Sequence, residues 1–164
     1  MYRVDITNSQ SCLKLDDAYL RDVVTRTLAD ERVASATIGL QVVDNKTIRD
    51  LNRRHLAHDY DTDVLSFLLE TIAAPERDDA RGSTPLRGAG KHIEGEIVVS
   101  AEMAVDRAVE FGWRPEDELT LYVVHGLLHL AGYDDTDAAE SAVMRQRESE
   151  ILAHWNLTPV RAGT

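Results

Sequence analysis

The segment PEDELTLYVVHGLLHLAGYDD, residues 115–135, decides how the rest of the chain is arranged. Pro115 suits the first position of a helix, and the acidic residues that follow it favour the positive end of the helix dipole. The run that continues to Leu130 is almost unbroken in apolar residues, which is typical of a helix buried on all sides. Gly132 suits the left-handed conformation that ends a helix. We therefore predict a central, buried helix.

Two histidines lie inside this predicted helix, at positions 125 and 129. Residues four apart lie on one helix face, one turn apart, so both imidazoles can reach one metal ion. Gly132 lets the chain reverse, and Asp135 can then return to the same point. Two imidazoles and one carboxylate leave a coordination position open, which is typical of a catalytic metal that activates water. His125, His129 and Asp135 are therefore the candidate metal ligands.

Three other interpretations of this pattern stay open. The first is a pair of ordinary core histidines, although imidazoles in so apolar a helix need polar partners. The second is a metzincin-type protease, whose pattern is similar but needs a glutamate as general base where this chain has Gly126. The third is the two-histidine, one-carboxylate iron site of oxygenases, which we do not expect on a single helix.

Hydrophobic periodicity outside the central helix predicts the other elements. Asp16 or Asp17 is predicted to cap the first helix and Thr136 the last. The predicted elements are strand 2–7, helix 17–31, strand 36–43, a helix after the Asp44–Asn45 turn, strands 62–69 and 95–100, helix 101–111, the central helix, and a helix from 137 to about 155. This order predicts an α+β fold, in which a small mixed sheet of about four strands packs with about five helices and the central helix carries the metal site.

Residues 71–92 are rich in Pro, Gly, Arg and Asp and lack periodicity. We predict a mobile loop there, inside one domain that spans residues 1–164, because too little chain lies on either side for two cores. The length of 164 residues fits one domain of ordinary size.

Composition limits the location and the partners of the protein. The single cysteine, Cys12, excludes an internal disulfide framework and fits a reducing, cytoplasmic location. We see no secretory signal, and no apolar run approaches the roughly 18–20 residues of a membrane span, so we expect no membrane partner. The net charge of −11 argues against broad, sequence-blind binding to nucleic acid, although screening leaves room for a local basic site.

Three separated blocks of the sequence resemble one known family. HGLLHLAGYDD, LNRRHLAHDYDTDVLSF (51–67) and GEIVVS (95–100) occur in the order seen in the YbeY family of metal-dependent endoribonucleases, and the resemblance covers roughly residues 35–152. It implies an α+β fold in which three side chains hold one divalent, zinc-type ion beside a cleft. It also implies cleavage of single-stranded RNA, a role in forming the end of small-subunit ribosomal RNA, and ribosome quality control, with ribosomal RNA and the small subunit as partners.

The sequence departs from this family pattern at the site. Asp135 stands where the family commonly has a histidine ligand, and Asp134 matches the family's own aspartate and stays the alternative ligand. A carboxylate can replace imidazole on zinc, but it favours harder ions such as manganese or iron. Leu56 stands where the family usually has an arginine thought to serve catalysis, and a leucine cannot neutralise a phosphate. Glu96 stands where the family mostly has aspartate. We expect it to lie behind the metal ligands or at the end of a strand.

Five residues are the further site candidates. Arg53, Arg54 or His58 is expected to supply the missing charge, with a solvated helix face and a surface hydrogen bond as the alternatives. Asp63 and Ser66 match the family's Thr-Asp/Asn-x-x-Ser block and are expected to face the metal, with a turn residue and a strand hydroxyl as the alternatives. We therefore take His58 and Asp63 as candidate catalytic residues, and Arg53, Arg54 and Ser66 as candidate RNA-binding residues.

The leading hypothesis is a metal-dependent endoribonuclease. One rival is a metal-dependent hydrolase of a peptide or small amide. The other is a ribosome-associated binding protein with a non-catalytic ion, for which Leu56 marks lost catalysis. Lys46 and Arg49, with Arg53, are expected to form a local basic strip.

Overall fold

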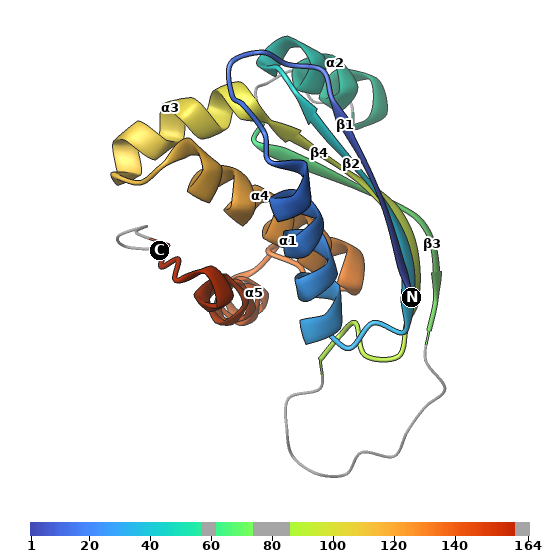
Figure 1. Cartoon of the computed structure of the whole chain (residues 1–164). Helices are drawn as coiled ribbons and strands as arrows, with labels where there is room; N and C mark the ends of the chain where they lie inside the picture. The colour runs from blue at the N-terminus through green and yellow to red at the C-terminus, as the bar shows by residue number, and fades with distance from the viewer. Residues whose placement is uncertain (57–61, 74–85, 160–164) are drawn as a thin grey trace.

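Four strands form one mixed sheet in the order β1-β2-β4-β3 (Figure 1). The structure is a computed structural model, and it describes residues 1–56, 62–73 and 86–159. The strands are β1 (Tyr2–Asn8), β2 (Ser35–Val43), β3 (Val64–Ile72) and β4 (His92–Ser100). β1, β2 and β4 run parallel, whereas β3 is antiparallel to β4. The predicted mixed sheet of an α+β fold is confirmed.

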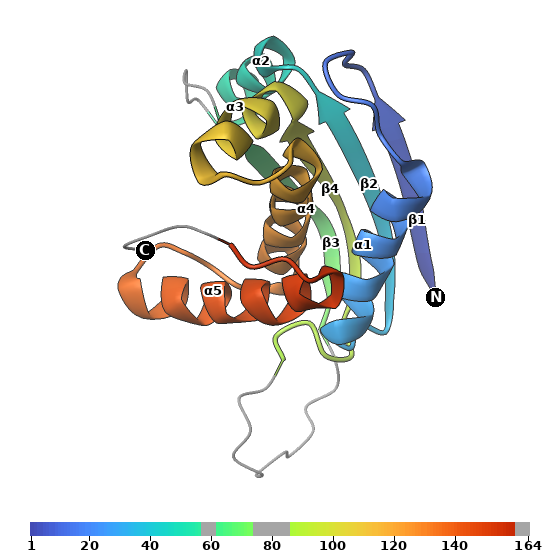
Figure 2. The same ribbon diagram turned by 60° about the vertical axis from the view of Figure 1, so that its left-hand side comes forward.

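Helices pack on both faces of this sheet, most of them on one face, here called the inner face (Figures 1 and 2). They are α1 (Asp17–Asp30), α2 (Asn45–Leu56), α3 (Ala101–Phe111), α4 (Pro115–Ala131) and α5 (Ala138–Leu152), and a short 3-10 helix (Ala153–Trp155) follows α5. α4 contacts β3 and β4 on one side and α1, α3 and α5 on the others. The predicted central helix is therefore correct, and α5 crosses its C-terminal half (Figure 2).

The ends of α4 follow from local chemistry. Pro115 opens the helix, and the Asp117 carboxylate accepts a hydrogen bond from the Arg114 backbone amide at 3.2 Å. At the other end Gly132 has a φ of 119°, a left-handed conformation that a glycine adopts without strain. Its amide donates to the Leu128 and His129 carbonyls, which stops the helix and turns the chain. This turn places the residues after Gly132 beside the histidines.

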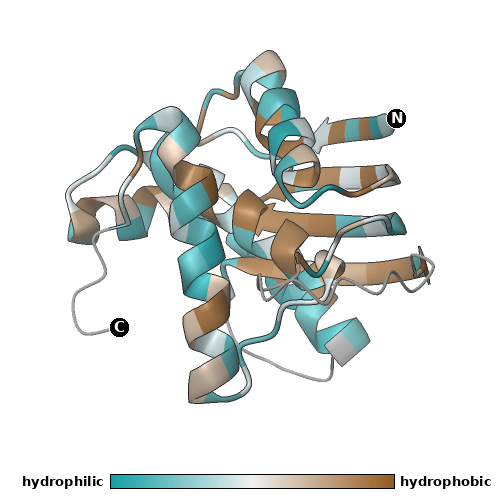
Figure 3. Ribbon diagram, turned by 90° about the horizontal axis from the view of Figure 1, so that it is seen from below, coloured by the Kyte–Doolittle hydropathy of each residue, from teal (hydrophilic) through white to brown (hydrophobic). Residues whose placement is uncertain are grey.

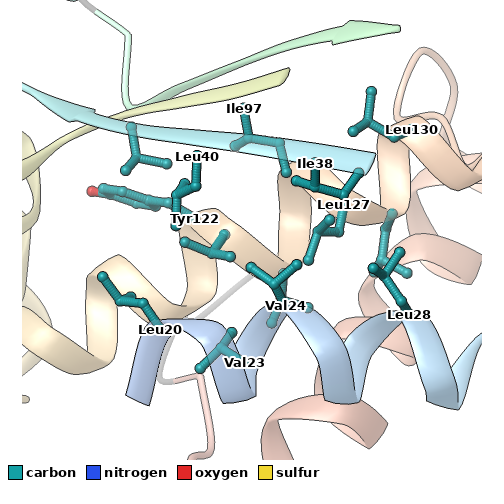
Figure 4. Packing of buried hydrophobic residues seen from close by; sticks show 14 of the residues in the cluster. Leu20, Val23, Val24, Leu28, Ile38, Leu40, Ile97, Tyr122, Leu127 and Leu130 are labelled. Atoms are coloured by element: carbon teal, nitrogen blue, oxygen red, sulfur yellow. The ribbon is translucent and has the colours of Figure 1, made fainter. Parts of the chain in front are cut away.

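The main core lies between the inner face of the sheet, α1 and α4 (Figure 4). Its fully buried members include Val23, Val24, Ile38, Leu40, Ile97, Tyr122 and Leu127. A smaller cluster lies on the opposite face, where Ile48 of α2 packs with Leu65 and Val98. β1 alternates between hydrophobic and hydrophilic residues, whereas the neighbouring strands are more uniformly hydrophobic (Figure 3). β1 and β3 are the two edge strands of the sheet.

α4 packs closely against the sheet at Gly126. A Cβ atom at that position would lie 2.8 Å from Cγ2 of Ile97 and 3.1 Å from Oγ of Ser66. Such distances are shorter than van der Waals contact, so the packing of helix on sheet requires glycine here. A glutamate, as a metzincin-type protease would need, does not fit at this position without displacing the helix.

The predicted loop over 71–92 is wrong at both ends. β3 continues to Ile72 and β4 begins at His92, and these two residues pair with each other. A β-bulge between Leu68 and Glu70 interrupts the alternation of β3, which hides the end of the strand in the sequence pattern. Residues 74–85 lie outside the described residues, and the single domain stays a prediction.

The predicted cap of the last helix is also wrong. Asp137, not Thr136, caps α5, because its carboxylate accepts from the Glu140 amide at 2.8 Å. The Thr136 hydroxyl instead donates to the Asp134 carboxylate at 3.2 Å. For α1, Asp16 is the cap of the two predicted candidates. No helix in residues 1–56, 62–73 and 86–159 has both the length and the apolar character needed to cross a bilayer.

Candidate metal centre

His125, His129 and Asp135 come together at the C-terminal end of α4. Nε2 of His125 lies 3.1 Å from Nε2 of His129, and each of these atoms lies 3.7 Å from Oδ2 of Asp135. The two histidines project from successive turns of α4, and the turn at Gly132 returns Asp135 to them. The three side chains are partly exposed, at 26, 28 and 48% respectively. The three predicted ligands thus converge on one accessible point.

The distances among these atoms fit a shared divalent ion. Two nitrogen ligands of one tetrahedral zinc ion, each about 2.0–2.1 Å from it, are about 3.3 Å apart. The observed separations of 3.1 and 3.7 Å lie close to this value. All three ligand atoms lie within 4.8 Å of one another, and their chemistry, two imidazoles and a carboxylate, suits zinc and harder first-row ions.

The other nitrogen of each histidine has a partner that orients the ring. Nδ1 of His125 lies 2.5 Å from a carboxylate oxygen of Glu148 on α5. Nδ1 of His129 lies 3.1 Å from the carbonyl oxygen of Tyr133. With Nδ1 as the donor in both contacts, Nε2 is the free acceptor, which is the form that binds a metal ion. These partners aim both Nε2 atoms at the same point.

Burial and charge act differently on the two histidines. Burial lowers the pKa of His125, but the hydrogen bond and the negative charge of Glu148 outweigh it, and the net pKa is raised. Burial lowers the pKa of His129, and the neighbouring His125 lowers it further. These two effects favour the neutral form of His129, which is the form that binds a metal ion.

A cleft of about 440 Å³ opens beside the three side chains. His125 and Asp135 form part of its wall. Its other lining residues are Asp63, Leu121, Ser141, Met144, Arg145, Glu148, Ser149 and Pro159. The cleft is thus built mainly between α4 and α5, and it gives a ligand access to the side chains of the centre.

The two candidates for the third ligand take different orientations. The Asp134 carboxylate accepts hydrogen bonds from the Asp135 amide at 2.7 Å and from Thr136 at 3.2 Å, so it stabilises the turn. The Asp135 carboxylate has no such role and lies beside both histidines. The geometry favours Asp135.

The two arginines expected to replace the family arginine lie away from the cleft. Arg53 forms an exposed ion pair with Asp50 at 2.9 Å, and Arg54 lies on the exposed side of α2. Neither belongs to the cleft wall. His58 lies outside the described residues, so its predicted role is untested.

Asp63 lines the cleft, whereas Ser66 contacts the backbone of α4. The Asp63 carboxylate lines the cleft and forms an ion pair with Arg107 of α3 at 3.2 Å. The Ser66 hydroxyl donates to the Gly126 carbonyl at 3.1 Å, which fixes α4 to β3. Glu96 lies near Gln41, on the face of β4 opposite to Ile97. The interpretation of Glu96 as a residue behind the ligands or at a strand end is therefore wrong.

A buried polar cluster, which the sequence analysis missed, lies behind the centre. Glu31 is 1% exposed and accepts hydrogen bonds from Nε of Arg147 at 2.8 Å, the Tyr133 hydroxyl at 3.0 Å and the Gly88 amide at 3.1 Å. Tyr133 thus connects the two sites, because its carbonyl faces His129. Glu148 was missed as well, since its 23-residue separation from His125 leaves no local pattern.

Comparison with known proteins decides the family. The profile described as Endoribonuclease YbeY matches residues 5–156. The chain belongs to the endoribonuclease YbeY family. A family protein named Endoribonuclease YbeY from Salinibacter ruber is 39% identical over 150 residues, which cover 91% of this chain and 89% of the relative. One of the same name from a Sulfurovum species is 36% identical over 158 residues, covering 96% and 94%.

A solved structure supports the fold. The solution structure of a Thermotoga maritima protein matches with a TM-score of 0.55, covering 100% of this chain and 99% of that one. At 22% sequence identity this likeness shows the fold alone. The family membership therefore rests on the sequence comparisons, and the resemblance inferred from the three motif blocks is confirmed.

Proposed function

We propose that the protein is a metal-dependent endoribonuclease that cuts single-stranded RNA during maturation of the small-subunit ribosomal RNA. The observation that carries this proposal is the convergence of His125, His129 and Asp135 beside an open cleft, in a chain of the endoribonuclease YbeY family. The proposal places the protein in the cytoplasm, with ribosomal RNA and the small subunit as its partners and a role in ribosome quality control.

One divalent ion per chain, of zinc type, would be held by Nε2 of His125, Nε2 of His129 and a carboxylate oxygen of Asp135. When bound, it supplies a Lewis acid for a phosphoryl oxygen or for water. Glu148 and the Tyr133 carbonyl hold the two imidazoles in the ligand orientation. His125 and Asp135 line the cleft, where a phosphodiester can approach them.

Asp63 is the candidate for proton transfer. Its carboxylate shares the cleft wall with His125, and Arg107 fixes its position through the 3.2 Å contact. A positioned carboxylate can accept the proton of an attacking hydroxyl group. Ser66, whose hydroxyl is committed to the Gly126 carbonyl, positions α4 in this scheme instead of binding RNA.

Two rival functions have less support. Peptide hydrolysis by a zincin mechanism lacks its general base at Gly126, where a larger side chain does not fit. A ribosome-binding protein without turnover requires no access to the ion, yet the three side chains here are partly exposed. The family relatives carry the name of an endoribonuclease.

The test is cleavage of a short single-stranded RNA by protein loaded with zinc, manganese or iron. We expect cleavage that a chelator abolishes and that Asp135→Ala reduces to background. Asp5→Asn, on exposed β1, is the control and should cleave like the wild type. Metal-loaded wild-type protein that binds RNA but does not cut it would support the binding-protein function, and cleavage of peptides instead of RNA would support the hydrolase.

A further inference from the structure

The cleft beside the candidate metal centre contains a cation that no family motif assigns. Arg145 lies on α5 and shares the cleft wall with Asp63, His125 and Asp135. Among the described residues that line this cleft, Arg145 is the only arginine or lysine. The other charged groups on the wall are carboxylates, so the position of this cation matters for any anionic ligand.

The orientation of α5 directs Arg145 towards the centre. Glu148 on the same helix lies 2.5 Å from His125, which shows that this side of α5 faces the centre. Residues three or four apart lie on one face of a helix, with Cβ atoms about 5–6 Å apart. Ser141, Arg145 and Glu148 follow this spacing and all line the cleft. They form one polar stripe along its wall, with Arg145 one helical turn from Glu148.

The charge of Arg145 is available to a ligand. Nearby arginines are already paired, Arg147 with Glu31 and Arg107 with Asp63. Arg145 is exposed and forms no ion pair with any carboxylate in the described part of the chain. A guanidinium presents two parallel N–H donors, which match the oxygens of a phosphate group.

We propose that Arg145 binds a phosphate group of the RNA strand that occupies this cleft. The proposal rests on the proposed endoribonuclease function. A chain with a net charge of −11, and three carboxylates on the cleft wall at Asp63, Asp135 and Glu148, repels a polyanion unless local cations offset the charge. Arg145 is such a cation, and its distance of one helical turn from Glu148 puts the bound phosphate next to the centre.

The test compares cleavage of a short single-stranded RNA by metal-loaded wild type, Arg145→Ala, Arg145→Lys and Arg26→Ala. Arg26 is the matched control, since it carries the same charge on α1 with a side chain 53% exposed. We expect kcat/KM to fall about 10- to 100-fold in Arg145→Ala, the usual range for a charge-assisted hydrogen bond. The kcat/KM of Arg145→Lys should fall less, because lysine keeps the charge but lacks the two parallel N–H donors of the guanidinium. Arg26→Ala should cleave like the wild type.

Salt dependence and metal content give readouts that a merely structural effect would not reproduce. Loss of one contact to a single-strand phosphate makes the slope of log kcat/KM against log salt shallower by about 0.7. Metal content should be the same in all four proteins. An unchanged rate and slope in Arg145→Ala would overturn the proposal, as would a loss of metal that accounts for the lower rate. A wild type that does not cleave RNA would instead overturn the proposed function, and the role of Arg145 with it.

Discussion

The buried cluster around Glu31 and the candidate metal centre lie on either side of Tyr133. They differ in whether their polar groups have partners and are closed to solvent. Around Glu31, each acceptor is matched by a donor from Arg147, Tyr133 or the Gly88 amide, and the carboxylate is sealed from water. At the centre, two Nε2 atoms and one Asp135 oxygen converge at a partly exposed point beside an open cleft. Saturated polar groups indicate a structural role, and converging unsaturated acceptors indicate a binding site.

Glu31→Gln tests the structural side of this comparison and should have the largest effect. Removing the Glu31 charge leaves the largely buried Arg147 with only its more exposed partners, Glu150 and Asp30, which costs about 3 kcal/mol of unfolding free energy. Adding Arg147→Met should recover part of this loss, because it removes the charge that has lost its buried partner. Urea unfolding of metal-free protein measures both. A loss below about 1 kcal/mol in Glu31→Gln would show that the cluster is not the structural anchor described here.

Gly126→Ala acts on the packing of α4 against the sheet. The added Cβ would lie 2.8 Å from Ile97 and so must displace α4 or the strand beneath it. We expect a loss of about 1–3 kcal/mol in unfolding free energy, the usual cost of overpacking a core. Metal affinity should fall as well, since α4 carries both histidines. An unchanged free energy of unfolding would mean that the sheet can shift at this contact at little cost.

Glu148→Gln tests the binding side and should have a smaller effect. The substitution weakens the contact that orients His125, and the loss of such a partner typically lowers metal affinity about 10- to 100-fold. The stability of metal-free protein should change little. Glu150→Gln, which removes a charge that faces Arg147 instead, is the control and should leave metal affinity as it is. Equal affinities in both variants would contradict a supporting role for Glu148.

The sequence predicted those features that have a local pattern. Helical and strand periodicity predicted the helices and strands in the right order. The four-residue spacing with Gly132 and Asp135 predicted three residues whose side chains come together in the structure. The β3–β4 hairpin was cut short because a bulge and the polar residues Glu70 and Glu94 break its alternation. Such an interruption has the same sequence pattern as a loop.

Contacts between elements far apart in the chain could not be predicted from the sequence. Glu31 and Arg147 are 116 residues apart, and in the sequence each looks like an ordinary solvated charge. Arg145 and Glu148 belong to a helix with charged residues on several sides, so nothing local marks the stripe that faces the cleft. Because the family arginine is missing, the sequence favoured nearby Arg53 and Arg54 as its replacements. The cation on the cleft wall is instead Arg145 of α5.

Metal content, determined by elemental analysis after zinc, manganese and iron have each been offered, tests the central claim most directly. The proteins to compare are the wild type, His129→Ala, Asp135→Ala and Asp134→Asn, the last of which keeps the Oδ1 acceptor that stabilises the turn. We predict about one ion per chain in the wild type and in Asp134→Asn, and none in the other two. A wild type that stays free of metal under all three conditions, or an Asp135→Ala variant that keeps its full metal content, would contradict the account.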